Sequence, residues 1–299
     1  MASPKSVVIT VCALVNLVVI IVGGWSLLSF KGQVYDYRQH ISTTDEALFF
    51  QFGDGNLSAD DERLLAHIRS RLTRPSPRRP RRLTNSGRKH FSQIGQSEWV
   101  DERLKQRRNG FFVECGAFDG ETYSNSLFFE LERNWTGLLV EANPNNYRTL
   151  LEKNRNAYVL GACLSPTRLP GQLKFQPAHE LGGIVDKMLP GHMNRINSEK
   201  LGGTDVMVNC YPFNSIMDAL GIRHVDYFSL DIEGPELAIL ETIDFDRLRI
   251  DVLTIEYPIT GEGPATVEKL GNIRKLFERT KLYREVTIIR GSDVVFERI

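Results

Sequence analysis

The chain has 299 residues, of which 41% are hydrophobic and 25% are charged, and its 37 basic residues balance its 37 acidic residues. This composition excludes a disordered or fibrous protein, and the balanced charge argues against a nucleic-acid partner. Four cysteines without a Cys-x-x-Cys pair exclude a disulfide-dense scaffold and give no zinc motif, so we predict one sizeable domain without a metal site.

Residues 7–28 (VVITVCALVNLVVIIVGGWSLL) form an apolar run without a charged side chain. As a helix this run would span about 30 Å, which is the thickness of a bilayer core. Trp25 stands near one end, where interfacial aromatic residues occur. We predict a retained transmembrane signal-anchor; a cleaved signal peptide and a buried soluble helix are the alternatives.

The charges that flank this run are nearly balanced, so they do not fix its orientation. Two sequons, Asn56-Leu-Ser and Asn134-Trp-Thr, could carry a glycan only in a lumen. We therefore predict a cytoplasmic tail over residues 1–6 and a lumenal domain. The chain would be a single-pass membrane protein of the secretory pathway, in the endoplasmic reticulum, Golgi, endosome or plasma membrane.

Residues 29–89 have the composition of a stem or linker. A helical patch at 58–72 (SADDERLLAHIRSRL), with Ser58 as its N-cap, precedes a basic, proline-broken stretch within 69–89. This stretch has little apolar surface to bury, so a solvated linker and contact with an anionic surface are both open interpretations. A third is processing, because Arg79-Pro80-Arg81-Arg82 has the spacing preferred by proprotein convertases, which would cut after Arg82.

From residue 90 to residue 299, apolar runs of strand length alternate with helical patterns. The alternation predicts an α/β domain with a doubly wound, mostly parallel sheet and an antiparallel C-terminal hairpin. The predicted strands are Phe111–Ala117, Gly137–Ala142, Ala157–Leu164, Val206–Phe213, Asp226–Ile232 and Val252–Tyr257, the hairpin is Arg284–Arg290 with Asp293–Glu297, and the helices are Thr122–Glu132, Pro144–Lys153, Ser215–Leu220, Pro235–Thr242 and Thr266–Thr280.

Open α/β sheets bind ligands beyond the carboxyl ends of their strands, which here brings three loops to one rim: Gly116–Ser124, Glu141–Asn143 and Asp231–Gly234. The first loop has neither the G-x-G-x-x-G fingerprint nor the lysine of a P-loop, and Asp119 within it would repel a pyrophosphate. Glu141 can accept hydrogen bonds from both hydroxyls of a ribose. A glycine loop and a ribose carboxylate without phosphate-binding groups indicate S-adenosylmethionine, which has a ribose and a cationic part but no phosphate.

These segments also resemble a known family. FVECGAFDGETYSNS (112–126), GLLVEANP (137–144) and DYFSLDIEGPELAIL (226–240) are similar to FkbM-type, class I S-adenosylmethionine-dependent methyltransferases. FSQIGQSEWV (91–100), NWTGLLVEANP (134–144), ACLS (162–165) and the N-terminal apolar run further resemble animal Star-like membrane proteins. The first resemblance implies S-adenosylmethionine as cofactor and O-methyl transfer as the reaction. The second implies a role in exporting secretory cargo from the endoplasmic reticulum.

The family pattern implies a role for each polar residue of the rim. Asp231 and Glu233 would face the substrate side, with Asp231 as the candidate base; for each of them, bracing a loop or capping a helix is the alternative. On the cofactor side, Glu114, Gly116, Asp119 and Gly120 would line the methionine end, Ser124 and Asn125 would cap the next helix at that end, Glu141 would hold the ribose, and Ala142 and Asn143 would flank the adenine.

Cys163 and Cys210 lie on predicted strands and could pair in an oxidising lumen, although their spacing alone does not settle the geometry. Gly171–Asp205 follows no regular pattern, and we expect it to cover the acceptor site. Two functions stay open: a methyltransferase that acts on an unidentified acceptor in the secretory pathway, and a Star-like cargo-export protein that uses the same fold as a binding module.

Overall fold

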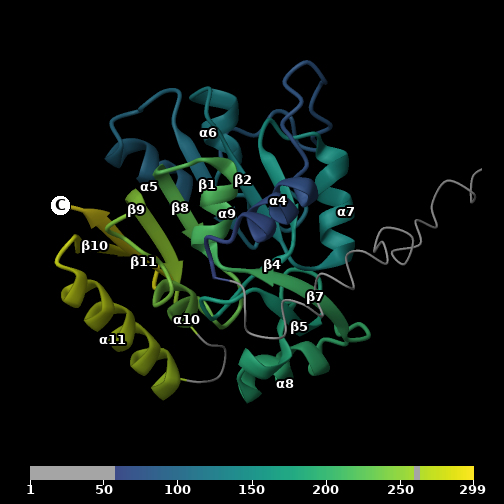
Figure 1. The fold of residues 1–299 in the computed structure, drawn as a ribbon, viewed down its shortest axis with the longest axis vertical. Coiled ribbons are helices and arrows are strands. Elements are labelled where there is room, and N and C mark those ends of the chain that lie inside the picture. Colours follow the sequence, from purple (N-terminus) through teal and green to yellow (C-terminus); the bar gives the residue numbers. More distant parts are fainter. Residues whose placement is uncertain (1–57, 259–262) are drawn as a thin grey trace, which may run out of the picture. The chain divides into compact units, whose positions relative to one another are not determined.

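The computed structural model describes residues 58–258 and 263–299 (Figure 1). The predicted membrane run at 7–28, the tail at 1–6 and Asn56 lie outside the described residues. Within the part of the chain that is described, no helix combines the length and the apolar character that crossing a bilayer requires.

Seven strands form the main sheet, in the order β10-β11-β9-β8-β1-β2-β3. Neighbouring strands are parallel except at β11, which pairs antiparallel with both β9 and β10. The order reverses between β1 and β8, because the chain first builds outward through β2 and β3 and then returns to the other side of β1. The predicted α/β sheet and its C-terminal hairpin are therefore confirmed. The strands are β1 (Phe111–Cys115), β2 (Thr136–Glu141), β3 (Tyr158–Gly161), β8 (His224–Leu230), β9 (Arg249–Glu256), β10 (Tyr283–Ile289) and β11 (Asp293–Arg298).

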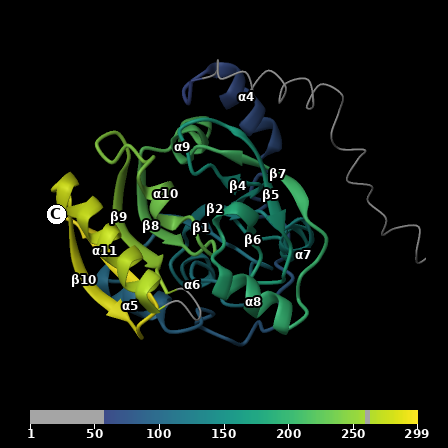
Figure 2. The same ribbon diagram turned by 90° about the horizontal axis from the view of Figure 1, so that it is seen from below.

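Helices cover both faces of the main sheet, and Figure 2 shows α5 and α6 on the side opposite to α4 and α9. Alternation along β8 explains this, because successive side chains of a strand point to opposite faces. Tyr227 joins the core beneath α6, whereas Phe228 stacks on Phe213 of α9 with ring centroids 4.7 Å apart. The helices are α4 (Glu62–Arg71), α5 (Gln96–Arg103), α6 (Leu127–Glu132), α7 (Pro144–Lys153), α9 (Phe213–Leu220), α10 (Glu236–Leu240) and α11 (Gly263–Thr280).

A second, smaller sheet has the order β4-β7-β5-β6. It corrects two expectations. The single strand predicted at Ala157–Leu164 is divided, because Ala162 turns the chain out of the main sheet after β3. The segment 171–205, expected to be irregular, contributes two strands and a helix to this region. The elements are β4 (Cys163–Leu164), β5 (Gly171–Gln176), β6 (Gly183–Ile184), the 3-10 turn η2 (Val185–Lys187), α8 (Pro190–Ser198) and β7 (Val206–Tyr211).

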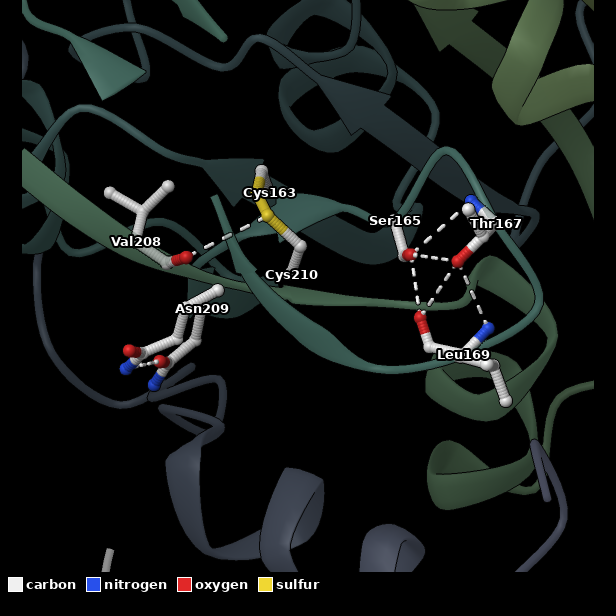
Figure 3. Close-up of a disulfide and its surroundings, with 8 residues drawn as sticks. Cys163, Ser165, Thr167, Leu169, Val208, Asn209 and Cys210 are labelled. Carbon is white, nitrogen blue, oxygen red and sulfur yellow. Dashed lines mark hydrogen bonds between the residues drawn. A yellow bond between two sulfur atoms is a disulfide. The ribbon is translucent and has the colours of Figure 1, made fainter. Parts of the chain in front are cut away.

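The two strands β4 and β7 are joined by a disulfide between Cys163 and Cys210 (Figure 3). The two cysteines are direct register partners in a parallel pair, and their Cα atoms are 4.4 Å apart. The sequence analysis left this pairing open, and the structure contains it. The remaining cysteine of the described part, Cys115, is buried and free.

The described part of the predicted stem packs on the sheet domain. The side chains of Leu64 and Ile68 on α4 are fully buried, and α4 lies against α9. The helix is capped by Asp61, whose carboxylate accepts a hydrogen bond from the Arg63 amide, and not by Ser58. The described residues, 58–258 and 263–299, belong to one compact unit, so this part of the predicted stem packs with the sheet domain.

Candidate functional site

A cavity of about 320 Å³ opens at the carboxyl ends of β1, β2, β8 and β9. This is the point where the strand order reverses, which is where open α/β sheets bind ligands. The small sheet and α8 supply the opposite wall with Phe175, Ile184 and Arg195. Of the predicted site residues, those that line the cavity are Glu114, Gly116, Asn125, Glu141, Ala142, Asp231 and Glu233.

Gly116 ends β1 at a position where no other residue fits. Its φ is +82°, and a Cβ atom there would lie 1.7 Å from the carbonyl oxygen of Asp231. The amide of Asp231 in turn donates to the Cys115 carbonyl over 3.2 Å. The first loop and the Asp231 loop are therefore in direct backbone contact beside the cavity.

Glu114 organises the loop after β1 from within the protein. One carboxylate oxygen accepts the amide of Asn125 over 2.7 Å, and the other accepts the hydroxyls of Ser124 (2.9 Å) and Ser126. Ser124 is thus turned toward Glu114 and does not line the cavity. Asn125 donates from its Nδ2 to Ser229, while its buried Oδ1 has no partner among the described residues.

Asp119 and Gly120 shape the same loop without lining the cavity. The Asp119 carboxylate accepts the amides of Glu121 (2.8 Å) and Thr122 (2.6 Å), together with the Thr122 hydroxyl. Gly120 packs against Leu150, whose Cδ1 would be 2.3 Å from an added Cβ. Asp119, predicted to line the methionine end of the cofactor, thus caps its own loop and is not part of the cavity lining.

Glu141 ends β2 and points into the cavity. Its two oxygens accept the amides of Phe118 and Asn143, each over 2.7 Å. The Asn146 side chain is a third hydrogen-bond partner of this carboxylate. Of the four acceptor directions of its two oxygens, one therefore remains for a ribose hydroxyl. Burial raises the pKa of Glu141 to about 7 in spite of these hydrogen bonds. Ala142 lines the cavity beside it, whereas Asn143 caps α7 by accepting the Asn145 amide.

Three carboxyl groups face the cavity from the strand ends on the β8 and β9 side. Oxygen atoms of Asp231, Glu233 and Glu256 all lie within 4.8 Å of one another. Burial raises the pKa of each of the three, and repulsion from nearby carboxyl groups adds to the effect. The pKa of Glu256 is raised well above the usual glutamate range, first by burial, and the hydrogen bond between Glu256 and Asp231 raises it further while lowering the pKa of Asp231. Such a cluster can accept a proton, and its spacing could also hold a divalent cation.

The loop that carries Asp231 and Glu233 is itself braced by α10. The Glu236 carboxylate accepts the amides of Ile232 and Gly234, both over 3.1 Å, and its other oxygen lies 2.6 Å from Lys269 Nζ. Glu233 has a left-handed backbone, with φ +59°. Glu236 therefore fixes the turn that directs both candidate catalytic carboxyl groups toward the cavity.

Glu256 is the site residue that the sequence analysis missed. A signal was present, because Glu256 lies at the carboxyl end of the strand predicted at Val252–Tyr257. In a parallel sheet that end lies on the same rim as Asp231. Tyr123, Asn146 and Arg195 also line the cavity, but they come from a loop, a helix face and α8, where no local pattern indicates a site.

Residues 114–284, more than half of the chain, match the sequence profile of the methyltransferase FkbM domain. The chain belongs to the methyltransferase FkbM domain family. The cofactor of this FkbM domain is S-adenosylmethionine. No curated protein matches the chain.

Three solved structures illustrate the likeness. The methyltransferase FkbM from Methylobacillus flagellatus is 14% identical with a TM-score of 0.36, over 63% of this chain and 43% of that one. A SAM-dependent methyltransferase from Aquifex aeolicus is 12% identical with a TM-score of 0.35, over 73% and 98%. An SAH-bound methyltransferase from Podospora anserina is 9% identical with a TM-score of 0.37, over 86% and 95%. The chain spans less than half of the Methylobacillus protein.

The residues of the cavity fit this cofactor. The cavity volume lies in the range of small-molecule sites, roughly 300–1,000 Å³. Carboxyl groups outnumber the single arginine of the lining, which suits a ligand with a sulfonium and an ammonium group. The unpaired Asn125 Oδ1 offers an acceptor to a ligand donor, and Glu141 offers its remaining acceptor direction to a ribose. The FkbM domain therefore has a cofactor cavity whose donors and acceptors match S-adenosylmethionine.

Proposed function

We propose that the chain is a membrane-anchored, S-adenosylmethionine-dependent O-methyltransferase of the secretory pathway. The observation that carries the proposal is the convergence of Glu141 and Asp231 on one cavity. A carboxylate suited to a ribose and a carboxyl group of raised pKa border the same small space. A methyltransferase that acts on a hydroxyl acceptor can use the first group to hold its cofactor and the second as a general base.

The division of roles follows from the carboxyl cluster. Bound S-adenosylmethionine supplies an electrophilic methyl group. Asp231 accepts the proton of the acceptor hydroxyl, because its hydrogen bond with Glu256 favours the ionised form of Asp231. Burial makes Asp231 a stronger base than an exposed aspartate, which brings its pKa nearer to neutral pH. Glu233 is the second candidate at the same wall.

The proposed compartment is a lumen of the secretory pathway. The Cys163–Cys210 disulfide supports it, because structural disulfides persist in oxidising compartments. The apolar run at 7–28 supports a single membrane anchor. Asn134 of the second sequon is exposed between α6 and β2. Peptide-N-glycosidase should increase the electrophoretic mobility of the wild-type chain more than that of Asn134→Gln. A lumenal domain would be contradicted if Asn134 carries no glycan and if external protease digests the domain in intact microsomes.

A Star-like cargo-export protein is the alternative proposal. It is supported by the resemblance at residues 91–100 and 162–165 and by the single N-terminal apolar run. In that case the cavity would bind cofactor as a structural ligand without transferring a methyl group. The acceptor, secretory cargo or other partner is unidentified under both proposals.

Methyl transfer is tested with labelled cofactor. The full chain, solubilised in detergent, is incubated with S-adenosylmethionine labelled in its methyl group and with fractionated lumenal proteins, glycans and small molecules. We expect label in one fraction, loss of that label with Asp231→Asn, and full labelling with Asp205→Asn, which changes an exposed aspartate. Cofactor binding without label in any fraction would reject the enzyme and favour the export role.

A further inference from the structure

Residues 73–85, here called the strap, are bound along the edge of the domain. Thr73 pairs with Val159 through two backbone hydrogen bonds of 2.9 Å, beside the edge strand β3. The carbonyl of Pro80 accepts Asn154 Nδ2, and the amide of Arg82 donates to the Lys153 carbonyl, both over 2.9 Å. The strap thus follows the C-terminal end of α7 as ordered backbone, although its arginines are mostly exposed.

The strap has a first anchor at Glu121, which directly follows the glycine loop. The amides of Thr84 (2.8 Å) and Asn85 (2.6 Å) donate to the two Glu121 oxygens. Lys153 Nζ also donates to Glu121 over 2.6 Å. Glu121 is only 1% exposed, so these donors are what satisfies its buried carboxylate.

A second anchor lies at Glu130 on α6. Arg81 Nε and Arg155 Nε both contact the Glu130 carboxylate, the latter over 2.7 Å, and the Glu130 side chain is fully buried. Arg155 then donates to the Gly120 carbonyl and, over 3.1 Å, to the Ser126 hydroxyl, which donates to Glu114. A continuous chain of ion pairs and hydrogen bonds therefore connects Arg81 of the strap with Glu114 in the cofactor cavity.

The two anchors stand on opposite sides of the peptide bond at which the basic motif would be cut. Arg81 binds Glu130, whereas Thr84 and Asn85 bind Glu121, and the bond between Arg82 and Leu83 lies between them. A protease that cuts after basic residues requires an extended, accessible backbone, but the Arg82 amide is hydrogen-bonded to Lys153. Cutting therefore requires the strap to leave the domain, at least locally.

We propose that the strap couples this cleavage site to the cofactor cavity, so that cofactor binding protects the Arg82–Leu83 bond and release of the strap weakens cofactor binding. This inference rests on the proposed function, because it takes S-adenosylmethionine as the ligand. The coupling is reciprocal by thermodynamic linkage, since both events depend on one docked form of the strap. The cleavage is a hydrolysis: one water is consumed, Arg82 gains a carboxylate, and Leu83 gains an amine.

Trypsin and S-adenosylhomocysteine test the coupling in the detergent-solubilised full chain. The rate at which a new N-terminus appears at Leu83 is followed by mass spectrometry, with and without saturating S-adenosylhomocysteine. The dissociation constant for S-adenosylhomocysteine is measured by calorimetry. The variants are Arg81→Ala, which removes the contact with Glu130, and Arg78→Ala, which removes an exposed arginine from the same strap.

We expect S-adenosylhomocysteine to slow cutting at Leu83 by about five-fold or more in the wild-type chain. Arg81→Ala should cut faster without ligand and bind S-adenosylhomocysteine more weakly by a similar factor, whereas Arg78→Ala should match wild type in both. Equal cutting rates with and without bound ligand would overturn the coupling while leaving the cofactor site intact. A wild-type chain that binds no S-adenosylhomocysteine would instead reject the cofactor site itself. If Arg81→Ala does not fold, the wild-type comparison alone decides.

Discussion

The carbonyl oxygen of Asp231 occupies the space in which a side chain on Gly116 would begin, since a Cβ atom on Gly116 would lie 1.7 Å from it. The candidate base and the glycine loop thus touch through their backbones, with no side chain between them. The contact joins β1 to β8 at the point where the strand order reverses. It makes the shape of the cofactor loop and the position of Asp231 depend on each other.

Gly116→Ala should therefore disrupt the site and the fold together. The clash and the left-handed backbone should lower the free energy of unfolding by roughly 3 kcal/mol or more and abolish S-adenosylhomocysteine binding. Gly221→Ala is the matched control: its φ is +70°, but nothing lies within 4 Å of the added Cβ. Its cost should be about 1 kcal/mol, with binding retained. Urea unfolding measures the stability of each variant, and calorimetry measures its binding of S-adenosylhomocysteine. An equal loss of stability in Gly116→Ala and Gly221→Ala would contradict the importance of the Asp231 contact.

The pKa of Glu141 should appear in the pH dependence of cofactor binding. Burial raises this pKa to about 7, so the free protein carries a mostly protonated Glu141 at pH 6 and an ionised one at pH 8. Ribose hydroxyls donate to the ionised form, and binding should therefore tighten by about ten-fold between pH 6 and pH 8. Calorimetric titration of S-adenosylhomocysteine across this range should lose the trend in Glu141→Gln. A trend that persists in the variant would assign it to another group.

The buried pair of Glu130 and Arg155 should support stability at neutral pH. Burial raises the pKa of Glu130, but the charges of Arg155 and Arg81 lower it by more. The pKa of Glu130 in the folded protein is therefore below the usual value of 4.5. The ionised Glu130 therefore contributes fully to the free energy of unfolding at a pH above the pKa of the unfolded state. This contribution is lost as the pH falls through the lower pKa of the folded state. Glu130→Gln leaves Arg155 without its charge partner and should cost about 3–5 kcal/mol at pH 7.

Urea unfolding at pH 7 and pH 4 tests this prediction. The loss caused by Glu130→Gln should be smaller at pH 4 than at pH 7. Glu132→Gln, on the same helix but exposed, should change the free energy of unfolding by less than about 0.5 kcal/mol. Identical behaviour of the two variants would show that Glu130 is not a structural charge.

The disulfide should stabilise the small sheet that walls the cavity. Cys163 and Cys210 are separated by 47 residues, a loop whose closure contributes roughly 2–4 kcal/mol. Because Cys163 also lines the cavity, Cys163→Ser with Cys210→Ser should weaken S-adenosylhomocysteine binding as well as stability. Non-reducing peptide maps should link the two cysteines in the wild-type chain. A map without that link would contradict both the pairing and its support for an oxidising compartment.

The sequence predicted those elements whose signals are local. Proline at the first turn places the start of α7 at Pro144, as predicted, and the apolar runs of β1 and β2 match within two residues. Glu141 was recognisable because its distance from the glycine loop and its place at a strand end are both visible in the sequence. Glu256 also stands at the carboxyl end of a predicted strand, β9, so the rule that ligands bind at these strand ends would have found it.

Features that depend on distant partners were not predictable. The break at Ala162 is decided by Cys210 and Tyr211, which pair with β4 and not with the main sheet. The basic composition of the strap predicts a solvated linker. Its partners Glu121 and Glu130 lie 36 to 49 residues away along the chain, so no local pattern indicates that the strap is bound. A local contact was also missed, because the Asp119 carboxylate, predicted to line the methionine end of the cofactor, accepts the amides of Glu121 and Thr122.

The central claim is that the cavity binds S-adenosylmethionine through Glu141, and calorimetric titration of S-adenosylhomocysteine into the full chain tests it most directly. We predict a dissociation constant on the order of micromolar, weakened at least about ten-fold in Glu141→Ala, because hydrogen bonds to a charged group are lost. Glu152→Ala, which changes an exposed glutamate on α7, should bind as the wild type does. No binding by the folded wild-type chain, or equal binding by Glu141→Ala, would contradict the account.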